Sequence, residues 1–143
     1  VQQQIRIAAG QKLSFRQRDI VRKGHAIECR INAEDPYTFV PSPGRITSYH
    51  APGGPGIRVD SHVYQNYVVP PYYDSMVGKV IAYGDTRNQA IARMRIALSE
   101  MVVEGIRTNI PLHLDLLIDE SFVRGGTSIH YLEERLAKKK AAG

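Results

Sequence analysis

The chain has 143 residues, of which 43% are hydrophobic, and this length and composition fit one folded domain and exclude a disordered protein. Its formal net charge is +5, but Lys138, Lys139 and Lys140 supply three of those charges in a run typical of a solvated tail. The single cysteine excludes an internal disulfide and favours a reducing, cytoplasmic location, and no apolar run is long enough to span a membrane.

The first ten residues predict the back half of a helix that ends before Gly10. No capping residue precedes this helix, and no initiating methionine is present. We therefore expect residues 1–10 to be the tail of a helix from a preceding domain in a longer protein. Residues 13–23 are polar and basic, as expected for a loop or a short ordered turn.

A strand is predicted from His25 to Ala33, because its residues alternate between apolar and polar side chains. The apolar set includes Cys29, which we interpret as a small buried hydrophobe and not a nucleophile. The polar set consists of Glu28, Arg30 and Asn32, spaced about 7 Å apart along the strand. Two interpretations stay open: Arg30 forms a solvated pair with Glu28, or it presents a fixed positive charge to an anion.

The middle of the chain combines turn signals with short strands. We expect turns at residues 34–36 and 41–44, strands over 45–50, 57–60 and 76–83, and a brief extended segment at 67–69. The loop Ala51–Gly56 is glycine-rich, but Pro52 and Pro55 each lack an N–H donor and a strand follows it. A structural turn is therefore favoured over a phosphate-binding loop.

Helical periodicity replaces strand periodicity in the last third. A helix is predicted over residues 87–103, with Thr86 and Gln89 forming a capping box. A shorter helix starts at Pro111 with Asn109 as its cap, Gly125 and Gly126 interrupt the chain, and a last helix covers residues 130–139. Strands followed by helices favour an α+β fold with a mainly antiparallel sheet.

Other candidate sites are weaker. The five histidines show no metal-ligand spacing, so no metal site is expected. Ser75 beside Asp74 could complete a catalytic triad only with a distant histidine, and no nucleophile elbow surrounds it. Asp74 follows two prolines and two tyrosines, and it either bonds nearby backbone or acts as an acidic anchor that orients Arg30.

Four segments together resemble the C-terminal domain of biotin carboxylase. These segments are residues 24–36, 41–44, 50–54 and 70–76. The resemblance runs over essentially the whole chain and includes residues 125–127 and 129–132. It implies that residues 1–143 are the last part of a three-domain ATP-grasp enzyme. The separate bacterial subunit of acetyl-CoA carboxylase, which serves fatty acid biosynthesis, is the most similar form.

The resemblance implies roles for individual residues. Arg30 matches the arginine that contacts the biotin ureido oxygen and the bicarbonate end of the site. Glu28, Asn32 and Asp74 are the supporting residues that the local sequence pattern, and not the resemblance, suggests. Ile129 and His130 match positions near the adenine of ATP. Arg58 and Pro55 match subunit-interface positions, although some bacterial members carry a bulky aromatic where Pro55 stands.

The whole enzyme would use ATP, Mg²⁺ and bicarbonate to carboxylate biotin. Its implied partners are a biotin carboxyl carrier protein, a second copy in a homodimer and a carboxyltransferase complex. The ligands for magnesium and phosphate lie upstream in the family, so this chain alone is expected to bind none of these cofactors and to be inactive.

Two alternatives remain from the residues themselves. The chain could be a non-catalytic dimerisation or assembly domain of a related ATP-grasp protein. Its net charge also allows a basic nucleic-acid-binding module, although arginines interleaved with aromatics on a sheet are not visible. Neither a nucleic acid nor a membrane is therefore the expected partner.

Overall fold

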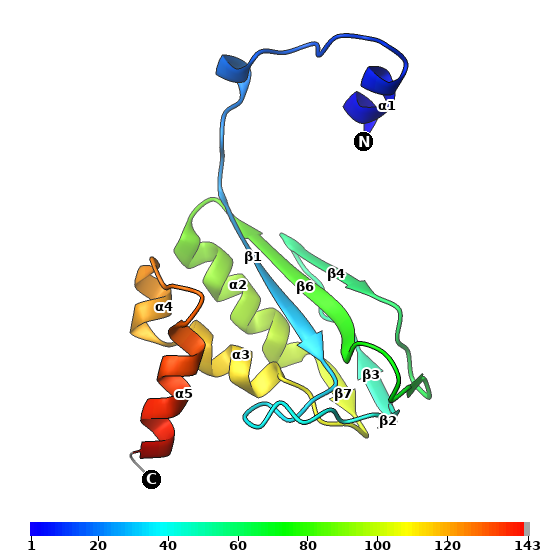
Figure 1. Ribbon diagram of the computed structural model, residues 1–143, viewed down its shortest axis with the longest axis vertical. Helices are drawn as coiled ribbons and strands as arrows, with labels where there is room; N and C mark the ends of the chain where they lie inside the picture. The colour runs from blue at the N-terminus through cyan, green and yellow to red at the C-terminus, as the bar shows by residue number, and fades with distance from the viewer. Residues whose placement is uncertain (142–143) are drawn as a thin grey trace.

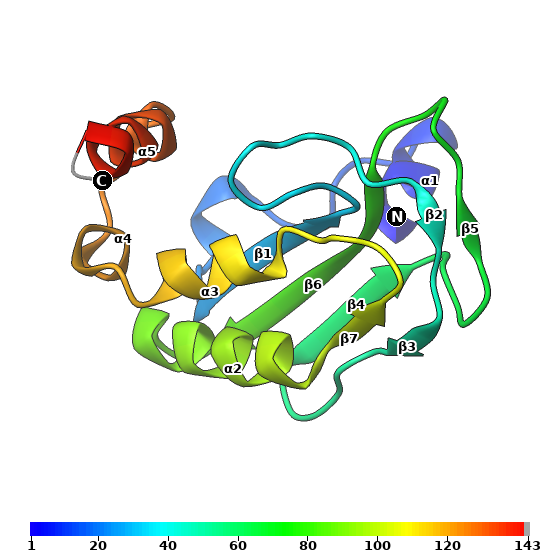
Figure 2. The same ribbon diagram turned by 90° about the horizontal axis from the view of Figure 1, so that it is seen from below.

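The computed structural model describes residues 1–141, and at its centre an antiparallel sheet is covered on one face by a long helix (Figure 1, Figure 2). The sheet has the strand order β1-β6-β4, with β1 at His25–Asn32, β6 at Met76–Gly84 and β4 at Ile57–Ser61. Helix α2, Arg87–Glu100, follows β6 and lies across the sheet. The predicted α+β class and mainly antiparallel sheet are confirmed.

Strand β1 buries every second side chain, as its alternation predicts. Ile27, Cys29 and Ile31 are buried, whereas Glu28 and Arg30 face outward. Their partners in the core come from β6 and α2 and include Val80, Met94 and Leu98. A slip of the strand by one residue would exchange its two faces, so this core fixes which side chains point to the outside.

Helix α2 begins at the predicted cap. Thr86 Oγ1 accepts a hydrogen bond from Gln89 N at 3.2 Å. The reciprocal bond of a capping box is displaced by one residue, because Gln89 Oε1 accepts from Asp85 N at 2.6 Å instead of from Thr86 N. The cap is therefore real, although only half of the predicted box forms.

The predicted end of this helix at residue 103 is wrong. The helix stops at Glu100, and Val102–Glu104 forms strand β7, which pairs antiparallel with β3 at Ser48–His50. Two β-branched valines and a strand partner outweigh the helical spacing of the apolar side chains here.

The predicted strand at residues 45–50 is two strands in separate sheets. β2 at Gly44–Arg45 pairs with β5 at Val68–Val69, whereas β3 pairs with β7. Ile46 lies between β2 and β3 and is fully buried. The strands predicted at 57–60 and 76–83 are confirmed to within one residue.

Three helices follow the strands. α3 spans Ile110–Leu117, α4 Glu120–Arg124 and α5 Tyr131–Ala141. The first and last match their predicted positions closely, but α4 was not predicted. It is too short to show a helical period, and it is capped by Asp119 Oδ1, which accepts from the backbone N–H groups of Ser121 and Phe122.

The segment before β1 lies apart from the sheet (Figure 1). Helix α1, Gln2–Ala8, confirms the predicted helix, and a single 3-10 turn follows at Gln17–Asp19. α1 contains no buried residue, and the side chain of Ile5 is 65% exposed. Its apolar stripe is thus uncovered in the part of the chain that the structure describes.

Gly56 connects the loop before β4 to the sheet and to α2. Its φ of +75° lies in the left-handed region. A Cβ atom there would lie 2.6 Å from Tyr83 O and 2.5 Å from Arg93 Nη1. The flexible arginine can move aside, but the backbone carbonyl of β6 cannot, so this position accepts only glycine.

We expect Gly56→Ala to destabilise the chain by at least about 1–2 kcal/mol, because alanine is strained at positive φ and its Cβ meets Tyr83 O. Urea unfolding followed by circular dichroism measures the change. Gly53→Ala is the matched control, since Gly53 has no positive φ and open space around it. Equal stability of the two variants would contradict this account.

Candidate functional site

The register of the sheet places charged side chains from three strands on the face away from α2. Arg30 of β1 pairs with Lys79 of β6, which pairs with Asp60 of β4. Paired residues point to the same side of a sheet, so these side chains form a row. A second row lies beside the first, and together the two rows define the outer sheet face: Glu28, Arg30, Arg58, Asp60, Lys79 and Ile81.

Arg30 is exposed on this face and held only loosely by its neighbour. Its Nε donates to Glu28 Oε1 at 3.2 Å, and its side chain remains 67% exposed. An exposed pair of this kind stabilises a protein by about 0–1 kcal/mol. Glu28 therefore orients the Nε edge of the guanidinium and leaves its terminal nitrogens available to an anion.

Asn32 does not flank Arg30 in the way the alternation suggested. Its Nδ2 donates to Glu34 Oε1 at 3.2 Å, and the other Glu34 oxygen accepts from Ser75 Oγ at 3.2 Å. The pairing of β1 with β6 shifts register between Ile31 and Asn32, and such an irregularity re-aims the side chain that follows it. The end of β1 is thus joined to the segment before β6 through Glu34, which the sequence analysis did not single out.

Asp74 bonds to nearby backbone, which is the first of the two roles considered for it. Its Oδ1 accepts from Met76 N at 2.8 Å, at the start of β6. In the described part of the chain, the carboxylate recorded beside Arg30 is that of Glu28. The interpretation of Asp74 as a direct anchor for Arg30 is therefore not supported by its contacts.

The backbone of Arg30, in contrast, is held by the start of α3. Asn109 Nδ2 donates to Arg30 O at 3.0 Å, and Asn109 Oδ1 accepts from Asn32 N at 2.9 Å. His113 Nε2 lies 2.9 Å from the same Arg30 oxygen. Asn109 occupies the predicted cap position, but its side chain forms no cap bond to α3. Sequence reasoning located this residue and missed what its amide does.

The contact with Arg30 also sets the protonation of His113. A carbonyl oxygen only accepts, so the Nε2 of His113 must carry a proton. Burial lowers the pKa of His113 below its usual value, against the opposing effects of the bond to Arg30 O and the negative charge of Glu34. The imidazole is therefore a neutral, Nε2-protonated donor near neutral pH.

We expect the stability of the chain to fall as the pH is lowered below about 6.5, the value of an unperturbed histidine. Because the folded state has the lower pKa, the unfolded state binds the proton first, and acid favours unfolding until the folded pKa is passed. Urea unfolding between pH 7.5 and pH 5 measures the slope. His113→Gln should reduce it, and an unchanged slope would show that His113 is not the titrating group.

Arg58 and Asp60 form a two-bonded ion pair on β4. Arg58 Nε and Nη2 lie 2.9 and 2.8 Å from the two oxygens of Asp60. This pairing lowers the pKa of Asp60 and raises that of Arg58. Arg58 is nevertheless exposed, and the strand register places it on the same outer sheet face as Arg30. Its interface role stays a prediction.

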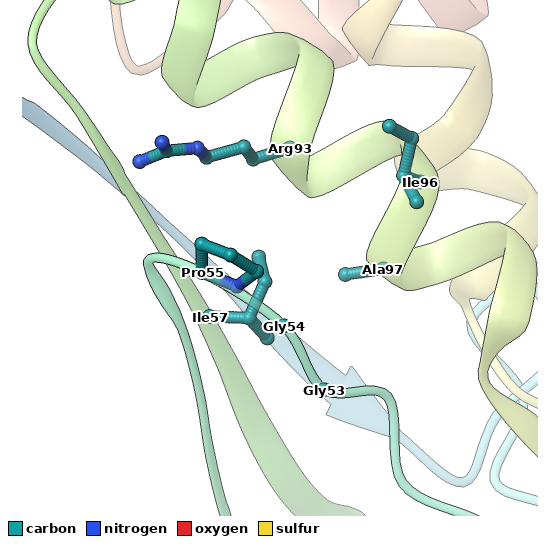
Figure 3. A pocket seen from close by; sticks show the side chains of 7 residues that line it. All are labelled: Gly53, Gly54, Pro55, Ile57, Arg93, Ile96 and Ala97. Carbon is teal, nitrogen blue, oxygen red and sulfur yellow. The ribbon is translucent and has the colours of Figure 1, made fainter.

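A shallow groove of about 230 Å³ lies between the loop before β4 and α2 (Figure 3). Pro55 lines one side, and Arg93 and Ile96 line the other. Arg93 Nη1 donates to Tyr83 O at 2.6 Å, so its guanidinium is engaged by the sheet. The loop Ala51–Gly56 leads into a strand, which fits the structural-turn interpretation and not a phosphate cradle at a helix start.

Ile129 and His130 lie outside the sheet and α2. They precede α5, which lies beside α3 and α4 (Figure 1). Ile129 is 92% exposed, and His130 Nδ1 lies 3.5 Å from Glu133 Oε2. The structure therefore groups Glu28 with Arg30 but does not bring these two residues to the same site.

Cys29 is buried, as predicted, beneath the outer sheet face. It is 5% exposed and belongs to the core. Burial first, and then the charge of Glu28, raise the pKa of its thiol to about 12. A thiol of this kind is not a nucleophile at neutral pH.

Within residues 1–141, no three histidine, cysteine, aspartate or glutamate side chains gather as a metal site would require. Over the same residues, no helix combines the length and the apolar character needed to cross a bilayer.

Known proteins carry the same module. Residues 28–134 match the family described as biotin carboxylase C-terminal domain. The chain is 61% identical over 140 residues to the biotin carboxylase of Pseudomonas aeruginosa, covering 98% of this chain and 31% of that protein. It is 63% identical over 136 residues to the Haemophilus influenzae biotin carboxylase, covering 95% and 30%.

A solved structure agrees. The biotin carboxylase domain dimer of Hydrogenobacter thermophilus 2-oxoglutarate carboxylase, in complex with MgADP and bicarbonate, has a TM-score of 0.85 and 46% identity over 92% of this chain and 29% of that one. The relatives also include a pyruvate carboxylase component from Methanothermobacter thermautotrophicus, which is 53% identical over 94% of this chain and 28% of that protein.

The fold is an α+β module that presents an exposed arginine on an open sheet face. The chain belongs to the biotin carboxylase C-terminal domain family. It spans about 30% of the length of the curated relatives it matches.

Proposed function

We propose that this chain is part of an ATP- and bicarbonate-dependent ligase that carboxylates a ureido nitrogen of biotin held on a carrier protein. The observation that carries the proposal is the exposed guanidinium of Arg30 on a rigid strand, with only its Nε edge engaged by Glu28. Support comes from the high identity to biotin carboxylases and from a similar domain solved with bicarbonate.

The chemistry explains why an arginine suits this position. Removal of the ureido proton places negative charge on the ureido oxygen. The nitrogen would then attack the carboxyl carbon of carboxyphosphate, made from ATP and bicarbonate, and the bond from that carbon to the phosphate oxygen would break as phosphate leaves. A guanidinium that is already in place stabilises this oxyanion without reorganising during the reaction. The charge is larger in the transition state than in neutral biotin, so Arg30 should act mainly on kcat.

The described residues do not fit Mg²⁺, because they contain no cluster of carboxylates able to bind it. We therefore assign MgATP to the rest of the enzyme and expect this chain alone to be inactive. Ile129 and His130 are the residues we propose to border the adenine. The exposed apolar side chain of Ile129 is available for such a contact.

We expect Arg30→Ala in the full-length enzyme to lower kcat for biotin carboxylation by about 10²–10³-fold, the usual cost of losing one oxyanion donor. The KM for ATP should change by less than about twofold, since Arg30 is not proposed to touch the nucleotide. Steady-state kinetics with free biotin measure both constants.

Arg30→Lys is the matched variant, because it keeps the charge and loses the planar fork, so it should fall between wild type and Arg30→Ala. An equal loss of biotin carboxylation and of ATP binding in a folded Arg30→Ala enzyme would contradict the assigned role. Wild-type kinetics in that variant would contradict it as well.

We further propose that the enzyme is a homodimer and that Arg58 and Pro55 contribute to its interface. The dimeric relative and the exposure of Arg58 on β4 support this assignment.

The same proposal includes a biotin carboxyl carrier protein and a carboxyltransferase complex as partners. Acetyl-CoA carboxylase, and with it fatty acid synthesis, is the proposed setting, because the identities of 61% and 63% to the biotin carboxylases of Pseudomonas aeruginosa and Haemophilus influenzae exceed the 53% to the pyruvate carboxylase component.

We expect Arg58→Glu to raise the dimer dissociation constant of the full-length enzyme by at least about tenfold, because it reverses a charge at the interface and repels Asp60. Sedimentation velocity over a concentration series measures the shift. Arg95→Glu on the exposed side of α2 is the control for the change in net charge. An unchanged dimer in Arg58→Glu would remove Arg58 from the interface.

A further inference from the structure

We propose that Asn109 and His113 are positioning residues for Arg30, acting through its main-chain carbonyl. The inference rests on the proposed function of Arg30. Asn109 is the cap of α3 and His113 lies within α3, and both would place the guanidinium without touching the substrate. Their four hydrogen bonds to Arg30 and Asn32 form one clamp.

The need for a clamp follows from the position of β1 at the edge of the sheet. β1 pairs with β6 on one side, and within residues 1–141 no strand pairs with its other side in the three-stranded sheet. An edge strand leaves alternate N–H and C=O groups without ladder partners. The oxygen of Arg30 and the N–H and oxygen of Asn32 belong to this free edge, and all three bond to α3 or to its cap.

Asn109 replaces the missing strand. Its side-chain amide donates to Arg30 O at 3.0 Å and accepts from Asn32 N at 2.9 Å, which is the pair of bonds that a neighbouring peptide would make. Its own backbone N–H donates to Asn32 O at 3.2 Å. Asn109 is 6% exposed, so water does not compete freely for these bonds. A carboxylate or an alkyl side chain at this position could not donate to Arg30 O.

His113 adds a second bond to the same oxygen. It lies four residues after Asn109 and hence on the same side of α3. Its Nε2 is 2.9 Å from Arg30 O, so the two donors occupy both lone pairs of that carbonyl. The carbonyl of Arg30 is thereby fixed from two directions.

The clamp acts where β1 is least regular. The pairing with β6 shifts register between Ile31 and Asn32, and the clamp holds the residues on both sides of that shift. The side chain of Arg30 has only the exposed pair with Glu28 to orient it. The position of its Cα therefore depends on α3, and a small displacement of a charged group from the reacting atoms lowers the rate strongly.

The test is a double-mutant cycle in the full-length enzyme. His113→Leu should lower kcat for biotin carboxylation by about 10–50-fold with little change in the KM for ATP. His113→Gln should restore most of the rate, because the glutamine Nε2 can donate to the same carbonyl. In an Arg30→Ala background, His113→Leu should change the rate by less than about twofold, since the group that it positions is gone.

Asn109→Asp is the second variant. It is nearly isosteric, keeps the acceptor for Asn32 N and loses the donor to Arg30 O, so it should show the same dependence on Arg30. If His113→Leu does not fold, this variant carries the test. Asn88→Asp in the first turn of α2 is the matched control, because Asn88 is exposed.

The outcomes distinguish the proposed function of Arg30 from the positioning role of Asn109 and His113. If Arg30→Ala retains wild-type kinetics, the proposed function of Arg30 is wrong. If Arg30→Ala is slow but the clamp variants slow it further by their full single-variant factor, Arg30 keeps its role and the clamp is only structural. Wild-type rates in both clamp variants would likewise overturn the positioning role.

Discussion

The closure of the free edge of β1 is the constraint on which the site depends. One side of the strand is fixed by the ladder with β6 and by the core beneath it. On the other side, the start of α3 bonds to Arg30 O and to the N–H and oxygen of Asn32 through Asn109 and His113. Because Arg30 O and the backbone groups of Asn32 are bonded on this side as well, Arg30 projects from a backbone that cannot easily move, even though its side chain lies in solvent.

The ion pair and the backbone hydrogen bonds of Arg30 differ in the free energy that they contribute. The exposed pair between Arg30 and Glu28 stabilises the protein by about 0–1 kcal/mol, whereas leaving a buried backbone group without its partner costs about 1–3 kcal/mol. The backbone contacts therefore fix the position of the Arg30 Cα, and the ion pair with Glu28 only biases the direction of its side chain. The proposed role of Arg30 needs this combination, since a buried and tightly paired guanidinium would have no free donors for a substrate.

The sequence predicted features that depend on local pattern and missed those that depend on distant partners. The alternation in β1 and the cap at Thr86 are local, and both are confirmed. The helical spacing that ends with Met101 and Val102 predicts a helix to residue 103. Periodicity could not reveal the strand pairing that replaces it, because the partner strand β3 lies more than fifty residues earlier. Asn109 shows the same limit, because its amide has the chemistry of a cap but bonds to a strand 77 residues away. The roles of Arg30, Arg58, Ile129 and His130 came from the family resemblance. The contacts of Asn32 and Asp74 show where the local pattern alone does not specify side-chain geometry.

Cys29 adds a practical consequence. Alkylating reagents attack the thiolate, and in the folded chain this sulfur is both enclosed and held protonated. Since it is the single cysteine and the immediate neighbour of Arg30, any modification at neutral pH reports a moment when the first strand has left its place. Mass spectrometry after exposure to an alkylating reagent can therefore measure how often β1 opens locally next to Arg30.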